Sequence, residues 1–182
     1  VGQRVACAGA GYAVHAEMVS VPHNLVVGLP DKVDYESGAF TTLGAIALHG
    51  LRLANAQIGE TVAVIGLGVV GILTVQLAKA AGCRVLGMDP DASRRATAKS
   101  IGCQATATTD AEFREMIAEW TEGLGADVVI IAADTSSNEP VALAGETARD
   151  RATVVGVGAV GLDIPRRDYY EKELDFMVSR SY

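Results

Sequence analysis

Hydrophobic and polar positions follow one regular rhythm from residue 61 to the end of this chain of 182 residues. Short apolar runs rich in Val, Ile and Ala are separated by stretches with apolar residues at helical spacing. The short runs predict strands at 61–66, 84–89, 105–107, 127–133, 153–157 and 175–179. The stretches between them predict helices at 69–81, 92–101, 110–121 and 139–148, with a long loop after 157. This alternation predicts an α/β fold, a doubly wound parallel sheet with helices on both faces.

The first 60 residues follow other patterns. Gly and Pro punctuate short β segments that we expect at 3–8, 13–21 and 25–27. Residues 36–54 then show helical spacing after Asp34, a plausible N-cap, although Gly44 and Gly50 leave open one helix or two. We therefore divide the chain into a small β segment at 1–34, a connecting helical region at 35–60 and an α/β domain at 61–182.

Composition and charge narrow the class of protein. Apolar residues make up 49% of the chain and aromatic residues 5%, which predicts an aliphatic core. The net charge of −7 disfavours nucleic acid as a partner. No apolar run reaches the roughly 20 residues that span a bilayer, so we expect no membrane partner. Three widely spaced cysteines argue against a disulfide framework and favour a reducing, cytoplasmic compartment.

The two ends of the sequence suggest a piece of a longer protein. The chain does not start with Met, and it stops directly after the apolar run at 175–179. If that run is an exposed edge strand, it favours strand pairing between copies. We expect a homodimer, together with the remainder of a longer chain.

A glycine-rich turn carries the strongest chemical signal. It follows the apolar strand at 61–66 and opens the next helix, and it reads Gly66-Leu67-Gly68-Val69-Val70-Gly71. The first glycine permits a tight turn, the second lets backbone N–H groups approach a pyrophosphate, and the third lets the helix pack close to the strand. The positive end of the helix dipole then faces the phosphates. The turn predicts a site for the pyrophosphate of a dinucleotide.

Asp89 makes the prediction more specific. It ends the next strand, about 20 residues beyond the turn, where a carboxylate can accept hydrogen bonds from the adenosine ribose. A carboxylate would repel a ribose phosphate, so NAD(H) is favoured over NADP(H). Arg94 and Arg95 complicate the choice, because either can approach a phosphate or stack on adenine.

Further ligand contacts are expected where other strands end, since open α/β sheets bind ligands at their carboxyl edge. This nominates Ala132, Ala133 and Asp134 after one strand, and Gly158 and Ala159 after another. For each of these, ordinary loop geometry is an equally good interpretation.

No metal or nucleophile motif stands out. His15, His23 and His49 are scattered, and there is no His-Glu-x-x-His, Cys-x-x-Cys or Gly-x-Ser-x-Gly pattern.

The sequence resembles the medium-chain dehydrogenase/reductases, the family of zinc alcohol dehydrogenases and quinone reductases. The segments that carry the resemblance are 3–6, 11–22, 29–31 and, most closely, 58–71. The resemblance implies a Rossmann nucleotide-binding domain preceded by part of a GroES-like catalytic domain. It implies the NAD-selecting role of Asp89 and places Thr42 and its neighbours at the nicotinamide end.

The sequence also departs from the family pattern. In zinc enzymes of this family a Cys or acidic ligand stands at the start of the connecting helix, where Phe40-Thr41-Thr42-Leu43 offers neither. The partner ligands would lie before Val1, and the structural zinc lobe is absent. We therefore expect no zinc in this chain. Carbonyl polarisation would fall to hydroxyls, backbone N–H groups or water, with Thr41, Thr42 and Tyr12 as weak catalytic candidates.

Residues 40–48 and 170–174 further resemble a bacterial subgroup in which this half is fused to a Gfo/Idh/MocA-like oxidoreductase half. The resemblance implies an oxidoreductase that moves hydride between NAD(H) and a small alcohol, carbonyl or activated alkene, with the isolated chain inactive. Two alternatives stay open: a non-catalytic NAD(H)-sensing or scaffolding domain, and a zinc alcohol dehydrogenase whose ligands lie upstream.

Overall fold

The sequence-predicted sheet is present and wholly parallel. We describe residues 2–180 from a computed structural model of the chain. The strands are β3 (Thr61–Ile65), β4 (Arg84–Met88), β5 (Ala105–Ala107), β6 (Ala126–Ile131), β7 (Ala148–Gly156) and β8 (Asp175–Val178). They lie in the order β5-β4-β3-β6-β7-β8. The chain therefore builds outward from β3 to one edge and then from β6 to the other, which creates a switch point between these two strands.

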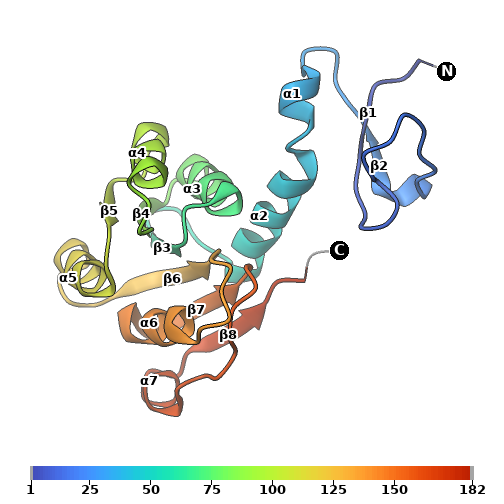
Figure 1. Cartoon of the computed structure of the whole chain (residues 1–182). Coiled ribbons are helices and arrows are strands. Elements are labelled where there is room, and N and C mark those ends of the chain that lie inside the picture. The colour runs from blue at the N-terminus through green and yellow to red at the C-terminus, as the bar shows by residue number, and fades with distance from the viewer. Residues whose placement is uncertain (1, 181–182) are drawn as a thin grey trace.

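Helices cover both faces of this sheet (Figure 1). They are α2 (Thr41–Ala54), α3 (Val69–Ala80), α4 (Ala92–Ile101), α5 (Asp110–Trp120) and α6 (Glu139–Thr147). Val62 and Val64 of β3 join the core formed with α2, α3 and α4, whereas Ala63 and Ile65 join the core formed with α5 and α6. All of β3 is buried, so its two faces have the same apolar character, as expected for a central parallel strand.

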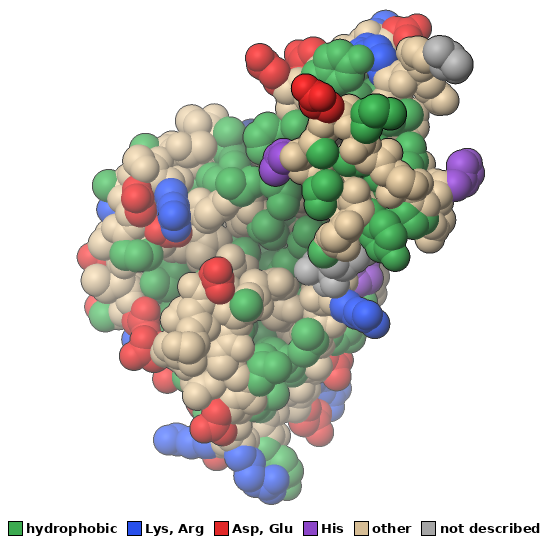
Figure 2. All heavy atoms as spheres, turned by 45° about the vertical axis from the view of Figure 1, so that its right-hand side comes forward, with side chains coloured by type: hydrophobic (Ala, Val, Ile, Leu, Met, Phe, Trp, Pro, Cys, Tyr) green, Lys and Arg blue, Asp and Glu red, His purple; other side chains and the backbone are tan. Residues whose placement is uncertain are grey.

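The N-terminal part stands apart from the sheet. A two-stranded antiparallel ribbon of β1 (Val5–Cys7) and β2 (Val26–Gly28) includes one turn of 3₁₀ helix, His23–Leu25, before β2. The helix α2 lies between this ribbon and the sheet (Figure 1). We call residues 5–28 the N-terminal lobe. Figure 2 shows its apolar side chains at the surface, and Met18 is the most exposed of them, at 91%.

The helical region before β3 is two helices. The short α1 (Tyr35–Gly38) begins at the predicted cap, where the Asp34 carboxylate accepts a 2.7 Å hydrogen bond from the Ser37 N–H. The chain breaks after Gly38 and restarts as α2, and the Thr41 hydroxyl donates to the Gly38 carbonyl at the junction. The question that the sequence left open is thus resolved in favour of two helices.

Two sequence predictions are wrong. The strand expected at 13–21 is a series of bends, because no strand of residues 2–180 lies beside it to complete a ladder. The stretch after 157, expected as a loop throughout, contains α7 (Arg166–Glu171), which was missed because it is short and buries only Tyr169. The strand expected at 153–157 also starts earlier, at Ala148. The other predicted helices and strands are confirmed.

Candidate functional site

The glycine turn joins β3 to α3 at the switch point of the sheet. Gly66 has a φ of +92°, and a Cβ there would lie 2.7 Å from the backbone N of Ala133. Only glycine fits a left-handed position that is also pressed against the neighbouring strand's backbone. A Cβ at Gly71 would overlap the carbonyl oxygen of Gly66, so α3 packs directly on the turn.

Gly68 differs from the other two glycines because it faces open space. No heavy atom lies within 4 Å of where its Cβ would be, and no side chain caps the helix that follows it. The first N–H groups of α3 are therefore available to an anion, at the positive end of the helix dipole. The turn fits the pyrophosphate of a dinucleotide. When bound, a nicotinamide dinucleotide would accept or donate a hydride at its nicotinamide ring.

Asp89 lies directly behind this turn. It follows β4, its side chain is only 3% exposed, and its Oδ2 accepts a 2.8 Å hydrogen bond from the Leu67 N–H. Its Oδ1 accepts a 2.9 Å hydrogen bond from the Asp91 N–H. The guanidinium of Arg94 lies 3.4 Å from Oδ2, while Arg95 donates to the carbonyls of Asp89 and Pro90. The carboxylate thus connects the glycine turn after β3 with the turn after β4.

A hollow of about 630 Å³ opens at the carboxyl ends of the strands, and we call it the carboxyl-edge hollow. Its lining comes from the ends of β3, β4 and β6 and from the starts of α3, α4, α5 and α6. The lining residues are Ile65, Gly66, Gly68, Val69, Val70, Met88, Asp89, Pro90, Arg94, Asp110, Ala132, Ala133, Asp134, Thr135, Ser137, Glu139, Pro140 and Leu143. Four carboxylates and one guanidinium are among them, so the hollow is net acidic.

The structure brings most of the sequence-nominated cofactor residues to this hollow. Gly66, Gly68, Val69 and Val70 line it, together with Asp89, Arg94 and Ala133. Three others lie outside the lining. They are Leu67, whose side chain is fully buried, Gly71, which packs under the turn, and Gly158, where a Cβ would overlap the carbonyl oxygen of Ala133.

The close packing at Gly158 accounts for a glycine there without a ligand. Direct cofactor contact by any of these residues stays a prediction. Sequence reasoning missed Asp110 and Glu139, which line the hollow from the starts of α5 and α6. Their place in the first turn of a helix that follows a strand was the signal that could have found them.

The weak catalytic candidates do not gather in this hollow. The hydroxyls of Thr41 and Thr42 donate to the carbonyls of Gly38 and Cys7, at 2.7 and 3.4 Å. Both threonines line a smaller hollow between α2 and the N-terminal lobe. Tyr12 is 52% exposed on that lobe and lines none of these hollows. Their catalytic roles stay predictions.

The residues present do not fit a zinc ion. Among residues 2–180, no three His, Cys, Asp or Glu side chains come together as a metal-binding group. The start of α2, where the family would place a ligand, carries two threonines that hydrogen-bond backbone carbonyls. We assign no step of the chemistry to zinc. In the same described range, no helix is long and apolar enough to cross a membrane.

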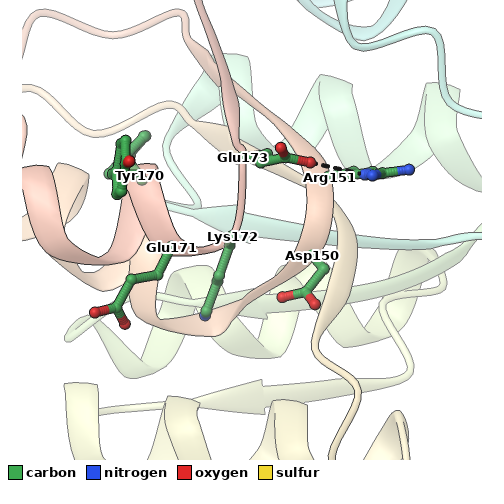
Figure 3. Close-up of a pocket in the computed structure, with 7 residues that line it drawn as sticks. Asp150, Arg151, Tyr170, Glu171, Lys172 and Glu173 are labelled. Atoms are coloured by element: carbon green, nitrogen blue, oxygen red, sulfur yellow. Dashed lines mark hydrogen bonds and ion pairs between the residues drawn. The ribbon is translucent and has the colours of Figure 1, made fainter.

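A second hollow of about 630 Å³ lies beside α7, and we call it the α7 hollow. It is lined by Asp150, Arg151 and residues 169–173, and Figure 3 shows how these side chains lie. The Lys172 ammonium donates to three backbone carbonyls at the end of α6, and Arg151 pairs with Glu173 at 3.0 Å. Burial raises the pKa of the Tyr169 hydroxyl well above its usual range, and that hydroxyl donates to the Val141 carbonyl.

The sheet order and the glycine turn define a dinucleotide-binding domain of the doubly wound class. Residues 69–182 match the family described as zinc-binding dehydrogenases. The chain belongs to this family, and it is a nucleotide-binding domain of the medium-chain dehydrogenase/reductases, as the resemblance in the sequence implied.

Curated relatives and solved structures agree with this assignment. An uncharacterized zinc-type alcohol dehydrogenase-like protein of Escherichia coli K12 is 33% identical over 173 residues, which are 88% of this chain and 48% of that protein. A structure described as a zinc-binding dehydrogenase of Sinorhizobium meliloti 1021 bound to NADP is 32% identical, with a TM-score of 0.76, covering 87% of this chain and 48% of that one.

The 2R,3R-butanediol dehydrogenase of Bacillus subtilis has 28% identity and a TM-score of 0.79, covering 90% of this chain and 48% of that one. The chain spans about half the length of the curated relatives it matches.

Proposed function

We propose that this chain is the NAD(H)-binding part of an oxidoreductase that moves hydride between the nicotinamide and a small alcohol, carbonyl or activated alkene. The observation that carries the proposal is the open face of Gly68 above the uncapped start of α3, with the Asp89 carboxylate behind it. Relatives that cover most of this chain have names such as (R,R)-butanediol dehydrogenase and D-xylulose reductase, which supports the substrate class.

The charge of the carboxyl-edge hollow supports NAD(H) over NADP(H). The residues Asp89, Asp110, Asp134 and Glu139 contribute four negative charges, and Arg94 contributes one positive charge. The additional phosphate of NADP(H) would be repelled by such a lining. Because a relative was solved with NADP, the test must include both cofactors.

Fluorescence titration of the chain with NADH and NADPH tests this proposal directly. We expect NADH to bind at least tenfold more tightly than NADPH. In Asp89→Asn the preference for NADH should shrink, because the ribose meets a neutral amide instead of a carboxylate. Equal affinity for both cofactors in the unchanged chain would contradict the NAD(H) assignment, and binding of neither would contradict the nucleotide site itself.

We further propose that this chain supplies no ligand for a catalytic zinc ion. The support is the donor set at the start of α2, which offers hydroxyls already bonded to carbonyls and neither a thiolate nor a carboxylate. Metal analysis of a longer protein that contains this chain tests the proposal, since stoichiometric zinc whose site includes Thr41 or Thr42 would overturn it. Turnover assays on alcohols, aldehydes and quinones distinguish an enzyme from an NAD(H) sensor.

We also propose a homodimer and a cytoplasmic location. The outer side of β8 is a free sheet edge within the described residues, and Val178 on it is 60% exposed. Free backbone groups of that kind pair readily with another strand. The three cysteines are unpaired, as is usual in a reducing compartment. Light scattering that gives the mass of a single chain at micromolar concentration would overturn the dimer.

A further inference from the structure

Both oxygens of the Asp89 carboxylate accept backbone hydrogen bonds in the structure without a ligand. One oxygen accepts from the Leu67 N–H at 2.8 Å and the other accepts from the Asp91 N–H at 2.9 Å. These donors belong to different turns, the glycine turn after β3 and the turn that leads from β4 into α4. At 3% exposure, the side chain is screened from water, so both bonds are strong and costly to lose.

Leu67 is the residue through which this bond acts on the turn. It stands between Gly66 and Gly68, and its own side chain is fully buried in the core. A Cβ on Gly87 of β4 would lie 2.9 Å from the Leu67 Cδ2 atom, so the side chain fills the space that this glycine leaves. Packing fixes the Leu67 side chain, and Asp89 fixes the Gly66–Leu67 peptide through its N–H, so the residue that precedes Gly68 is held at two points.

We propose that Asp89 is a positioning residue for the pyrophosphate turn, and that this role is separate from recognition of the ribose. The inference rests on the proposed function, since it assumes that the turn binds a pyrophosphate. Asp89 holds the Leu67 peptide so that Gly68 keeps its open face toward the hollow and the first N–H groups of α3 converge on the phosphates.

The hydrogen-bonding capacity of the carboxylate supports this assignment. A carboxylate offers about four lone-pair sites. The Leu67 N–H and the Arg94 guanidinium both approach Oδ2, and the Asp91 N–H takes one site on Oδ1. Most of the capacity of Asp89 is therefore used within the protein, and a ribose hydroxyl would meet an oxygen that already accepts a backbone hydrogen bond.

Calorimetric titration with ADP and with 2′,3′-dideoxy-ADP separates the two roles, because the second ligand keeps the pyrophosphate and lacks both ribose hydroxyls. The variants are Asp89→Asn and, as a matched control, Asp91→Asn. In Asp89→Asn the amide NH₂ must face one of the two N–H donors, so one backbone bond is lost without a change of shape. The Asp91 carboxylate caps α4 through the N–H groups of Ser93 and Arg94 and lies outside the carboxyl-edge hollow.

We expect Asp89→Asn to weaken both ligands by similar factors, about tenfold. The control keeps the single oxygen, Oδ1, that caps α4, so it should leave both affinities within about twofold. If Asp89→Asn weakens ADP and leaves dideoxy-ADP unchanged, Asp89 acts on the ribose alone and the positioning role is overturned. If the unchanged chain binds neither ligand, the proposed nucleotide site itself fails, and this inference fails with it.

A measurement on the unchanged chain decides the question even if Asp89→Asn does not fold. The scalar coupling across the hydrogen bond between the Leu67 amide nitrogen and the Asp89 carboxylate carbon should persist when ADP is bound. Its disappearance on binding would mean that the carboxylate releases the turn to take the ribose, which would overturn the proposal.

Discussion

Two hollows of equal volume, about 630 Å³ each, lie at opposite ends of the parallel strands. In the α7 hollow, most charged groups already have partners. Lys172 donates hydrogen bonds to three carbonyls. Arg151 forms an ion pair with Glu173 (Figure 3). In the carboxyl-edge hollow, the glycine turn leaves backbone N–H groups uncapped and a face of Gly68 without neighbours.

Equal volume therefore does not make the two hollows equal candidates for a binding site. Backbone donors without a partner favour the carboxyl-edge hollow, because leaving them unpaired costs free energy that a ligand can recover. The α7 hollow is best explained as a junction where the Lys172 side chain completes the end of α6 and the start of β7. The comparison predicts that changes at the carboxyl edge alter binding, whereas changes at the α7 hollow alter stability alone.

The largest effect is expected for Gly71→Val, which attacks the packing beneath the turn. A Cβ at this position overlaps the Gly66 carbonyl oxygen, a backbone atom that cannot rotate away. We expect a loss of at least about 3 kcal/mol in the free energy of unfolding together with loss of NADH binding. Urea denaturation checks the first and fluorescence titration the second. A variant with the stability and affinity of the unchanged chain would refute the packing role.

Lys172→Met tests the other side of the comparison. The ammonium donates hydrogen bonds of 2.8, 2.8 and 2.9 Å to the carbonyls of Gly145, Glu146 and Ala148. Methionine keeps much of the stem and removes all three, so the free energy of unfolding should fall by roughly 1–3 kcal/mol. NADH affinity should stay within about twofold. A large loss of affinity would show that the α7 hollow communicates with the cofactor site.

A smaller, pH-dependent effect is expected at Cys103, whose thiol lies in the core behind the glycine turn, near Gly87. Burial raises the pKa of the Cys103 thiol from 9.0 to about 11. The unfolded chain therefore loses this proton first as the pH rises, so the contribution is fully present below about pH 9 and lost as the pH approaches 11.

Chemical denaturation between pH 8 and pH 11 checks this effect. The unchanged chain should lose on the order of 2 kcal/mol more than Cys103→Ala over that range. Because lysines and tyrosines titrate in both proteins, only the difference between them reports on Cys103. Parallel stability curves would contradict the assignment.

The central part of the fold could be predicted from sequence because several signals agree there. The strand β3 is buried throughout and apolar from Val62 to Ile65, the glycines mark a turn, and Asp89 directly follows the next strand. The pattern failed at 13–21, where alternation alone predicted a strand but no neighbouring strand is present among residues 2–180. A strand depends on its partner as well as on its own residues.

The residues of the candidate site likewise depend on segments that are distant in the sequence. The glycine turn and Asp89 are local motifs, whereas Asp110 and Glu139 reach the carboxyl-edge hollow through the order of the strands. The hydrogen bond from the Leu67 N–H to the Asp89 carboxylate could likewise not be predicted from the sequence, since it joins residues of two different turns. Such contacts between distant segments can be predicted only when the order of the strands in the sheet is known.

The most direct test of the glycine turn as the cofactor site is fluorescence titration with NADH of the unchanged chain and of Gly68→Val. Gly68 has an ordinary φ of −67° and open space at its Cβ, so valine there should leave the fold and the melting temperature nearly unchanged. Its side chain would occupy the place of the pyrophosphate. We predict that the unchanged chain binds NADH and that Gly68→Val loses at least about 100-fold in affinity. Full NADH affinity in a folded Gly68→Val variant would contradict the claim that this turn holds the cofactor.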